Sequence, residues 1–306
     1  MKEKTALIFP GGGMTLAFDS VVSDFYQRIE HEIGTDVRQI LKSDSLSVTY
    51  APLLINIMNL AWYAKLAERL PDYKWDATAG LSAGQTTAMV VSGAIEQRYA
   101  FYLLKKVCEF IHEIPLEDRG ILYSMVYTAT FDDSILNEEN GVYVAVDAKK
   151  GRITIGGKQS VIEAFVREHD KQNGIKLYPL DKIEGAYHTP CITDPAHGVR
   201  AIVYEDKSNR YFHKTRIPII VNTSGSYIRE IHEIKNEIWS QLPQKVRWQD
   251  SLRFMHHDME IDAYVVVGPD EAETIRKTIL SVAPNARVSA VKDQASLDSL
   301  LDKIAS

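Results

Sequence analysis

The sequence predicts an α/β fold built on a mostly parallel sheet, and three observations support this prediction. Short continuous apolar runs at residues 5–9, 75–79, 217–222 and 263–267 are typical of strands buried on both faces of a sheet. Helical patterns separate these runs, as expected when crossover helices join parallel strands. The 306 residues suffice for one large domain with an insertion, or for two domains.

Composition narrows the class of protein. The chain is 45% hydrophobic and 25% charged, which is ordinary for a globular enzyme, and its net charge of -6 argues against non-specific nucleic-acid binding. Cys108 and Cys191 lack metal-ligand spacing, so we expect two reduced thiols. No signal peptide is visible, and the longest apolar run, 51–61, is too short to cross a bilayer. We therefore expect a soluble, cytoplasmic protein without a membrane partner.

The first half of the chain alternates strands and helices. The strand at 5–9 ends at Pro10 and the turn Gly11-Gly12-Gly13, which suits either phosphate binding or backbone N–H groups that face an active site. No Lys-Ser/Thr follows that turn, as a phosphate-binding loop would require. Helical patterns are expected at 18–41, 51–70, 86–93 and 97–114, with the strand 75–79 between the second and third.

The pattern changes near residue 120. Short strands are predicted at 121–127, 142–146, 152–156 and 175–180, with a helix at 160–173 that we expect Ser160 to cap. If residues 132–139 form a short helix, the order is β-α-β-β-α-β, which predicts a small ferredoxin-like insertion. The last third contains the strand 217–222, helices around 231–238 and 248–255, and a last buried strand at 263–267.

The segment Gly80-Leu81-Ser82-Ala83-Gly84 has the pattern G-x-S-x-G. Such a serine lies on a sharp turn between a buried strand and a helix, and the turn needs glycines because backbone and side chains approach closely there. The helix that follows directs free N–H groups at the site. Five residues alone are a weak signal, so the other segments decide whether Ser82 is a nucleophile.

Several motifs in order resemble one family, the malonyl-CoA:acyl-carrier-protein transacylases, with the equivalent discrete or trans-acting acyltransferases of polyketide synthases. The resemblance covers essentially the whole chain and implies an α/β-hydrolase-like core, residues 1–119 and 186–306, with a ferredoxin-like subdomain at 120–185. The motifs are Phe9-Pro10-Gly11-Gly12-Gly13, Gly80-Leu81-Ser82-Ala83-Gly84, Gly185-Ala186-Tyr187-His188, Val267-Gly268-Pro269, the stretch 49–54, the stretch 217–224 and the stretch 244–248.

The resemblance implies ping-pong acyl transfer through an acyl-serine. Ser82 matches the nucleophile and His188 matches the base that takes its proton. The family orients this histidine with a backbone carbonyl, which we match to Arg247. The N–H groups of Gly12 and Ala83 match the oxyanion hole. The remaining histidines, including His256 and His257, match no catalytic position.

The sequence also departs from the family at pocket positions. Gly12, Leu81 and Gln85 replace a glutamine, a histidine and a carboxylate, and Ala51 stands where another glutamine is usual. The arginine that grips the malonyl carboxylate falls on Val107, and the adjacent Lys106 would point about 100° away on a helix.

A carboxylate buried opposite valine would cost several kcal/mol, so we expect an acyl group other than malonyl. We place Leu81, Gln85, Val107, Tyr187 and Arg247 in the substrate pocket. Arg247 is an alternative partner for a carboxylate, and Tyr187 occupies a position that helps to set substrate size.

Three functions fit these residues: an acyltransferase of polyketide or related biosynthesis, a hydrolase that clears acyl groups from carrier proteins, and a degenerate member that binds carrier protein without catalysis. Retention of both Ser82 and His188 favours catalysis. The expected partners are an acyl carrier protein and a CoA or phosphopantetheine thioester, without a bound cofactor or metal. We expect a monomer, with Lys214, Arg216, Lys245 and Arg253 as candidate contacts to an acidic carrier.

Overall fold

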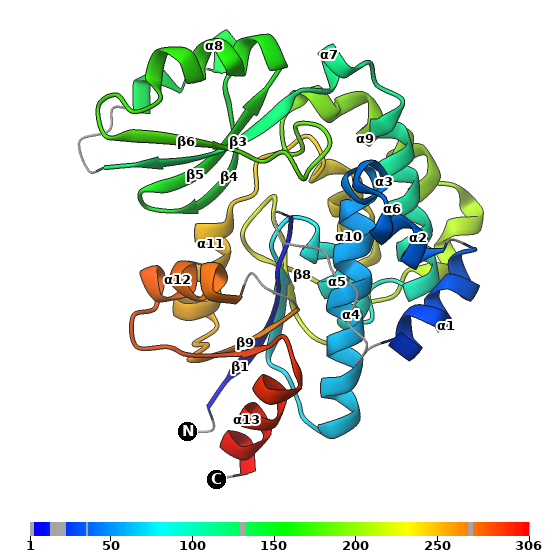
Figure 1. The fold of residues 1–306 in the computed structure, drawn as a ribbon. Helices are drawn as coiled ribbons and strands as arrows, with labels where there is room; N and C mark the ends of the chain where they lie inside the picture. Colours follow the sequence, from blue (N-terminus) through cyan, green and yellow to red (C-terminus); the bar gives the residue numbers. More distant parts are fainter. Residues whose placement is uncertain are drawn as a thin grey trace.

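The computed structural model describes residues 3–12, 23–34, 36–128, 133–136, 138–268 and 272–305. It confirms an α/β fold with a mostly parallel central sheet and a small antiparallel sheet, which Figure 1 shows as a separate layer beside the core. Parts of four predicted segments lie outside the described residues: Gly13, Pro269, residues 18–22 and 35, and residues 132 and 137.

The central sheet has the strand order β10-β9-β1-β2-β7-β8, and every adjacent pair from β10 to β7 is parallel. The expected strand at 263–267 is present but is not the last, because β10 follows and pairs with it. The strands are β1 (Thr5–Phe9), β2 (Ala77–Gly80), β7 (Ile219–Ile220), β8 (Tyr227–Ile228), β9 (Ala263–Val267) and β10 (Arg287–Val291).

Helices cover both faces of this sheet. Side chains of a strand alternate between the two faces, and in β1 the side chains on both faces are apolar and buried. Leu7 and Phe9 of β1 belong to the larger apolar core, whereas Ala6 and Ile8 belong to a second core. The larger core holds α4 (Ala51–Arg69), α5 (Gly84–Val91), α6 (Gln97–His112), α9 (Thr193–Val203) and α10 (Ile231–Ser240). The second core holds α11 (Trp248–Arg253) and α12 (Ala272–Val282).

The remaining helices are short or peripheral. A π-helical segment, Phe254–Asp258, extends α11, and 3-10 turns precede α9 and follow it. The other α-helices are α1 (Ser23–Ile33), α2 (Val37–Lys42), α3 (Asp44–Thr49), α7 (Leu116–Arg119), α8 (Gln159–His169) and α13 (Gln294–Ala305).

The small sheet has the order β4-β5-β3-β6 and is antiparallel throughout. This is the strand order of a ferredoxin-like β-α-β-β-α-β unit, although 3-10 turns at Asp133–Ile135 and Glu138–Asn140 stand where the first helix was expected. Ser160 is not the cap of α8, because the helix already begins at Gln159. The strands are β3 (Ile121–Tyr127), β4 (Tyr143–Lys149), β5 (Arg152–Gly157) and β6 (Ile175–Pro179).

The small sheet is joined to the core beside the carboxyl ends of the central strands. The N–H of Val246 donates to the carbonyl of Ala145 at 2.9 Å, and Asp147 donates to Val246 at 3.0 Å. These bonds place β4 next to the segment that precedes α11. The division of the chain into residues 1–119 with 186–306, and 120–185, stays a prediction.

Candidate active site

Ser82 lies on a tight turn between β2 and α5, at φ 52°. A Cβ on Gly80 would lie 2.0 Å from the carbonyl carbon of Gly84, and one on Gly84 would lie 2.3 Å from the carbonyl oxygen of Phe9. Real side chains do not tolerate such distances, so both glycines are required for this turn. The predicted strand–turn–helix context of the G-x-S-x-G motif is therefore present.

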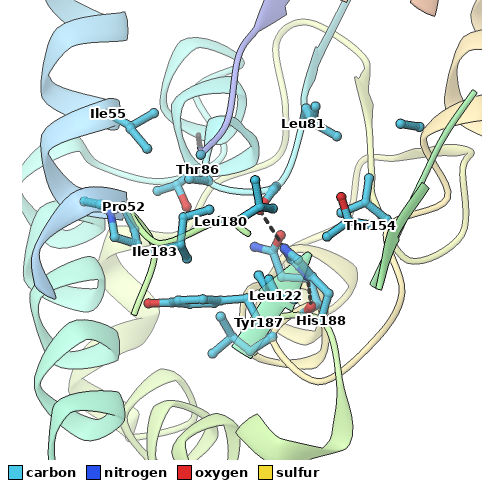
Figure 2. A pocket seen from close by; sticks show the side chains of 18 of the residues that line it. Pro52, Ile55, Leu81, Thr86, Leu122, Thr154, Leu180, Ile183, Tyr187 and His188 are labelled. Atoms are coloured by element: carbon cyan, nitrogen blue, oxygen red, sulfur yellow. Dashed lines mark hydrogen bonds between the residues drawn. The ribbon is translucent and has the colours of Figure 1, made fainter. Parts of the chain in front are cut away.

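His188 meets Ser82 from a loop 106 residues further along the chain. Its Nε2 lies 2.6 Å from the Ser82 Oγ, and Figure 2 shows this contact at the edge of a cavity. The N–H of His188 donates to the carbonyl of Leu242 at 2.6 Å, which anchors the residue at φ 64°. The structure thus brings together the two residues that the sequence singled out for nucleophilic chemistry.

The carbonyl that orients His188 belongs to Gln241, not to Arg247. His188 Nδ1 lies 2.8 Å from the Gln241 oxygen, and only a protonated Nδ1 can donate to a carbonyl. Nε2 of the neutral ring is therefore left as an acceptor for the Ser82 hydroxyl. Gln241 caps the end of α10, where backbone carbonyls lack partners within the helix and are free for such a bond.

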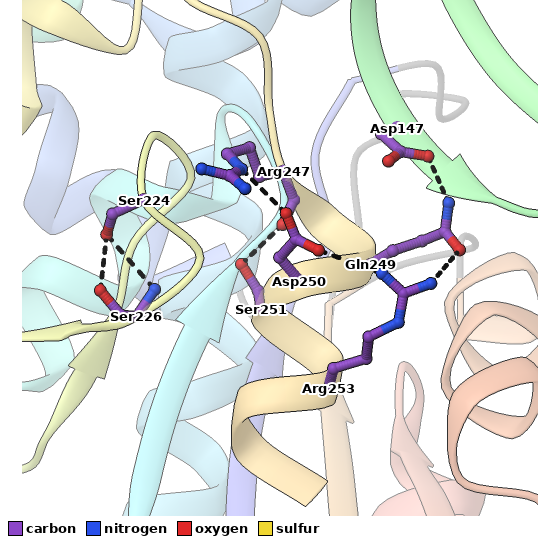
Figure 3. Close-up of polar contacts among 8 residues, drawn as sticks. All are labelled: Asp147, Ser224, Ser226, Arg247, Gln249, Asp250, Ser251 and Arg253. Carbon is purple, nitrogen blue, oxygen red and sulfur yellow. Dashed lines mark hydrogen bonds and ion pairs between the residues drawn. The ribbon is translucent and has the colours of Figure 1, made fainter. Parts of the chain in front are cut away.

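Arg247 is occupied elsewhere. Its carbonyl accepts from the Ser251 N–H at 3.0 Å and from the Ser251 hydroxyl at 3.1 Å, because Arg247 caps the start of α11. Its guanidinium forms an ion pair with Asp250 at 2.8 Å. The guanidinium of Arg253 pairs with the same carboxylate at 3.0 Å (Figure 3). The expectation that Arg247 orients the histidine and lines the pocket is wrong on both counts.

Burial sets the protonation state of His188. The side chain is 5% exposed, and burial lowers its pKa to about 4, while the hydrogen bonds to backbone at Gln241 and Gln244 oppose the shift. Burial disfavours the charged imidazolium, so the ring is neutral at pH 7. A neutral imidazole in hydrogen-bond contact with a serine hydroxyl is a competent general base.

Asn222, which the sequence reasoning did not single out, clamps the turn from the end of β7. Its Oδ1 accepts the N–H of Ser82 at 3.2 Å, and its Nδ2 donates to the carbonyl of Gly80 at 3.0 Å. The same Nδ2 donates to the Gln85 side chain, so Gln85 lies behind the serine and does not line the cavity as expected. The available signal was an asparagine as the last residue of the predicted strand 217–222, and in the structure it lies two residues beyond β7.

Two asparagines of α4 hold the turn from the other side. Asn56 donates to the carbonyl of Ala83 at 2.9 Å and accepts from the Thr87 hydroxyl at 2.6 Å. Asn59 donates to the carbonyl of Pro10 at 3.0 Å. Both asparagines are fully buried, so these bonds satisfy their own amide donors as well as the carbonyls of two turns.

A cavity of about 220 Å³ opens at Ser82. Figure 2 shows Pro52 and Ile55 of α4 on one side of it, Thr154 of β5 on the other, and the Tyr187 ring across from Thr86. The predicted pocket residues Leu81, Val107 and Tyr187 line it, together with Ser82, His188, Gly12, Ala83 and Ala51.

The charged residues that line this cavity, within the described part of the chain, are Lys149, Arg152 and Lys277. They belong to β4, β5 and α12, and α12 packs on the face of the central sheet opposite to α6. Val107 lies on α6, where the lining is apolar. None of Lys214, Arg216, Lys245 and Arg253, suggested above as carrier contacts, lines the cavity.

Gly12 and Ala83 both lie in the cavity wall next to Ser82. Among the described residues, neither amide has a hydrogen-bond acceptor within the protein. Two free N–H groups beside a serine hydroxyl are what an oxyanion hole requires. A Cβ on Gly12 would lie 2.8 Å from the Ile183 side chain, so Ile183 occupies the space that a larger residue would need.

The described residues contain no group of three or more His, Cys, Asp or Glu side chains arranged to hold a metal ion. No described helix has the length and apolar character needed to span a bilayer. Cys108 and Cys191 are both free, and burial raises the pKa of the Cys108 thiol to about 12.

Fold and geometry together define an α/β protein that presents a serine–histidine pair at the carboxyl edge of a parallel sheet. No protein-family model matches the chain. The malonyl CoA-acyl carrier protein transacylase of Bacillus subtilis is 23% identical over 319 residues, which cover 97% of this chain and 96% of that protein. The polyketide biosynthesis protein PksE of Bacillus subtilis is 23% identical over 86% of this chain and 34% of its own length.

Solved structures of malonyl-transacylases have the same fold as this chain. The malonyl-CoA:ACP transacylase of Synechocystis superposes with a TM-score of 0.81 at 20% identity, over 97% of this chain and 99% of that one. A malonyl-transacylase solved with the type II polyketide carrier protein AntF gives 0.83 at 17% identity, over 98% and 100%. The homologues and structure neighbours of this chain are thus malonyl-CoA:acyl-carrier-protein transacylases, which confirms the resemblance seen in the sequence and the fold.

Proposed function

We propose that this protein is an acyltransferase that moves an uncharged acyl group from a CoA or carrier-protein thioester to an acyl carrier protein, through an acyl-serine on Ser82. One observation carries the proposal: the Ser82 hydroxyl lies 2.6 Å from the buried, neutral His188, at a cavity whose α6 wall is apolar. The names of the relatives support acyl transfer to a carrier protein and a role in polyketide biosynthesis.

The reaction follows from the pair's geometry. Nε2 of His188 takes the Ser82 proton as Oγ bonds to the thioester carbonyl carbon, and the C–S bond then breaks. His188 returns the proton to the departing sulfur, which leaves as a thiol. The carrier's phosphopantetheine thiol reverses these steps: its proton passes to His188, a new C–S bond forms, the ester bond between the acyl carbon and Ser82 Oγ breaks, and His188 returns the proton to Oγ. Free N–H groups of Gly12 and Ala83 would stabilise the oxyanion in each half.

The acyl group is not malonyl, because the cations that line the cavity within the described residues, Lys149, Arg152 and Lys277, belong to β4, β5 and α12 and not to the α6 wall that carries Val107. A carboxylate beside Val107 would be buried among apolar side chains, and an unpaired buried charge costs several kcal/mol. The nearest basic residue in sequence, Lys106, pairs instead with Glu109 at 2.6 Å. An uncharged acyl group pays no such penalty.

The phosphopantetheine chain of the thioester enters the cavity on the side opposite to the apolar α6 wall. Lys149, Arg152 and Lys277 line the cavity where β4, β5 and α12 meet, and their positive charge suits the phosphate of phosphopantetheine and an acidic carrier. The solved complex of a structural neighbour with its carrier protein supports a carrier protein as acceptor.

The test combines the protein with an uncharged acyl-CoA and a holo carrier protein, and measures the masses of all three species. We expect acyl-enzyme, acyl carrier and little free acid, and we expect Ser82→Ala to abolish the first two. Predominantly free acid with carrier present would show a hydrolase and contradict the proposal. No adduct with any thioester would indicate a member that binds carrier protein without catalysis.

A further inference from the structure

The residues that line the cavity come from elements on the two faces of the central sheet, and we call the two groups its two arms. One arm runs towards β4, β5 and α12 and carries the three basic residues described above. The other, here called the inner arm, enters the larger core. It is lined by Ile55, Ile95, Ala100, Leu103, Leu104, Val107, Ile238 and Leu242.

The inner arm is deep. Ser82 precedes α5 and Ile95 follows it, so the arm reaches residues at both ends of that helix. Eight helical residues span about 12 Å. Ala100, Leu103, Leu104 and Val107 recur at the spacing of one face of α6, which forms the wall of the arm. Val107 is shorter than the arginine expected at this position of α6, so space remains in the inner arm beside it.

The size of the cavity limits the ligand. A cavity of about 150 Å³ lined by apolar side chains binds benzene, which has six carbons. The volume here is about 220 Å³. This volume is that of the whole cavity, both arms together, so by that comparison the inner arm holds an acyl group of at most roughly eight carbons. Malonyl would use little of this space and would place its one free carboxylate against apolar walls.

We infer that the substrate class is a medium-chain aliphatic acyl thioester, whose chain lies in the inner arm along α6 while the ester forms at Ser82. This inference rests on the proposed function, because the chain is held by the acyl-serine bond described there. Each methylene buried in the arm should favour acylation about fourfold until the arm is full.

The first experiment measures the rate of Ser82 acylation, as kcat/KM, for acetyl-, butyryl-, hexanoyl-, octanoyl- and dodecanoyl-CoA. We expect the value to rise by about two orders of magnitude from acetyl to hexanoyl, and to fall again at dodecanoyl. A profile that is flat or highest with acetyl would overturn the inference while the acyl-serine function stands. No adduct with any of the five would overturn both.

A second experiment fills the arm. Ala100 is fully buried on α6 and lines the arm, so Ala100→Leu should shift the preferred chain length to shorter acyl groups and lower the octanoyl-to-butyryl ratio at least tenfold. Ala67→Leu makes the same change on α4 at a residue that does not line the cavity, and it should keep the wild-type ratio.

Thermal melting checks that each variant is folded. An unchanged ratio in folded Ala100→Leu would place the chain elsewhere and contradict the inference. If that variant does not fold, Leu103→Phe provides the same test from the next turn of α6.

Discussion

Ser82 and His188 both hold left-handed backbone conformations, at φ 52° and 64°, and their side chains meet at 2.6 Å. Residues other than glycine rarely adopt such angles, and the cost of about 1–3 kcal/mol at each persists only where surrounding contacts enforce it. Here those contacts are the glycines beside Ser82 and the backbone bond from His188 to Leu242. The two strained backbone conformations direct the Ser82 hydroxyl and the His188 ring towards each other.

The pH dependence of acylation should reflect the buried histidine. His188 has a pKa lowered to about 4 by burial, so the neutral, active ring persists as the pH falls from 8 to about 5. Acylation kcat/KM should therefore stay level over that range and fall below it, as the ring takes up a proton. Rates of adduct formation, with circular dichroism to monitor folding, test this. A decline centred near pH 6.5 would show an ordinary, solvated histidine.

Asn222 should act as a positioning residue. Asn222→Ala removes the acceptor for the Ser82 N–H and the donor to the Gly80 carbonyl, and leaves buried polar groups unsatisfied. We expect a loss of about 2 kcal/mol in stability and a lower kcat with a nearly unchanged KM. Ser224→Ala, two residues away and exposed, is the control. An equal kcat in folded Asn222→Ala would contradict the role.

Val107→Arg should change the preference for charge. An arginine on this wall can pair with a malonyl carboxylate and also fills part of the inner arm. The ratio of malonyl to hexanoyl adduct on Ser82 should rise at least tenfold, whereas Val107→Leu, which adds bulk without charge, should leave malonyl disfavoured. Mass spectrometry of the adducts measures both ratios. An unchanged ratio in a folded arginine variant would refute this placement of the acyl group.

Glu237 on α10 should make stability depend on pH. Its carboxyl is 3% exposed and accepts from the Thr223 N–H at 3.2 Å and from the Thr223 hydroxyl. Burial raises its pKa from 4.5 to about 7, so the folded state holds a proton that the unfolded state releases above pH 4.5. This contribution to stability is present at low pH and is lost as the pH rises to 7.

The loss should be about 3 kcal/mol, because each pKa unit corresponds to about 1.4 kcal/mol. Glu237→Gln carries no charge, keeps an oxygen that accepts the Thr223 N–H, and presents an NH2 group that donates to the Thr223 hydroxyl. The stability difference between this variant and the wild type should therefore grow from pH 4.5 to 7 and remain constant above that. Urea unfolding at a series of pH values measures it, and a difference independent of pH would show that the carboxyl does not titrate in this range.

Ser82 and His188 could be predicted from the sequence because several motifs stand in the same order as in a known family, whereas the five-residue motif around Ser82 was a weak signal alone. It misplaced the orienting carbonyl, since any residue has one and only the end of α10 decides which is free. Gln85 was expected in the pocket because it stands at a flanking position of the motif around Ser82. On α5, however, its side chain points towards Asn222. A position in sequence does not fix the direction of a side chain.

The core strands were predictable because they are continuous apolar runs, as at β1 and β9. β10 was missed because it lies at the edge of the sheet, where four of its five residues are exposed or half-buried and its apolar pattern is weak. Asn222 was missed for a different reason. A polar residue after a strand is common, and only the folded chain shows that it reaches the turn at Ser82.

The central claim is that Ser82 accepts an uncharged aliphatic acyl group in place of malonyl. Its most direct test offers the wild-type protein equimolar malonyl-CoA and hexanoyl-CoA, then measures the intact mass and maps the adduct by peptide digestion. We predict a hexanoyl adduct on Ser82 in at least tenfold excess, absent from Ser82→Ala. A predominant malonyl adduct on Ser82 would contradict the account.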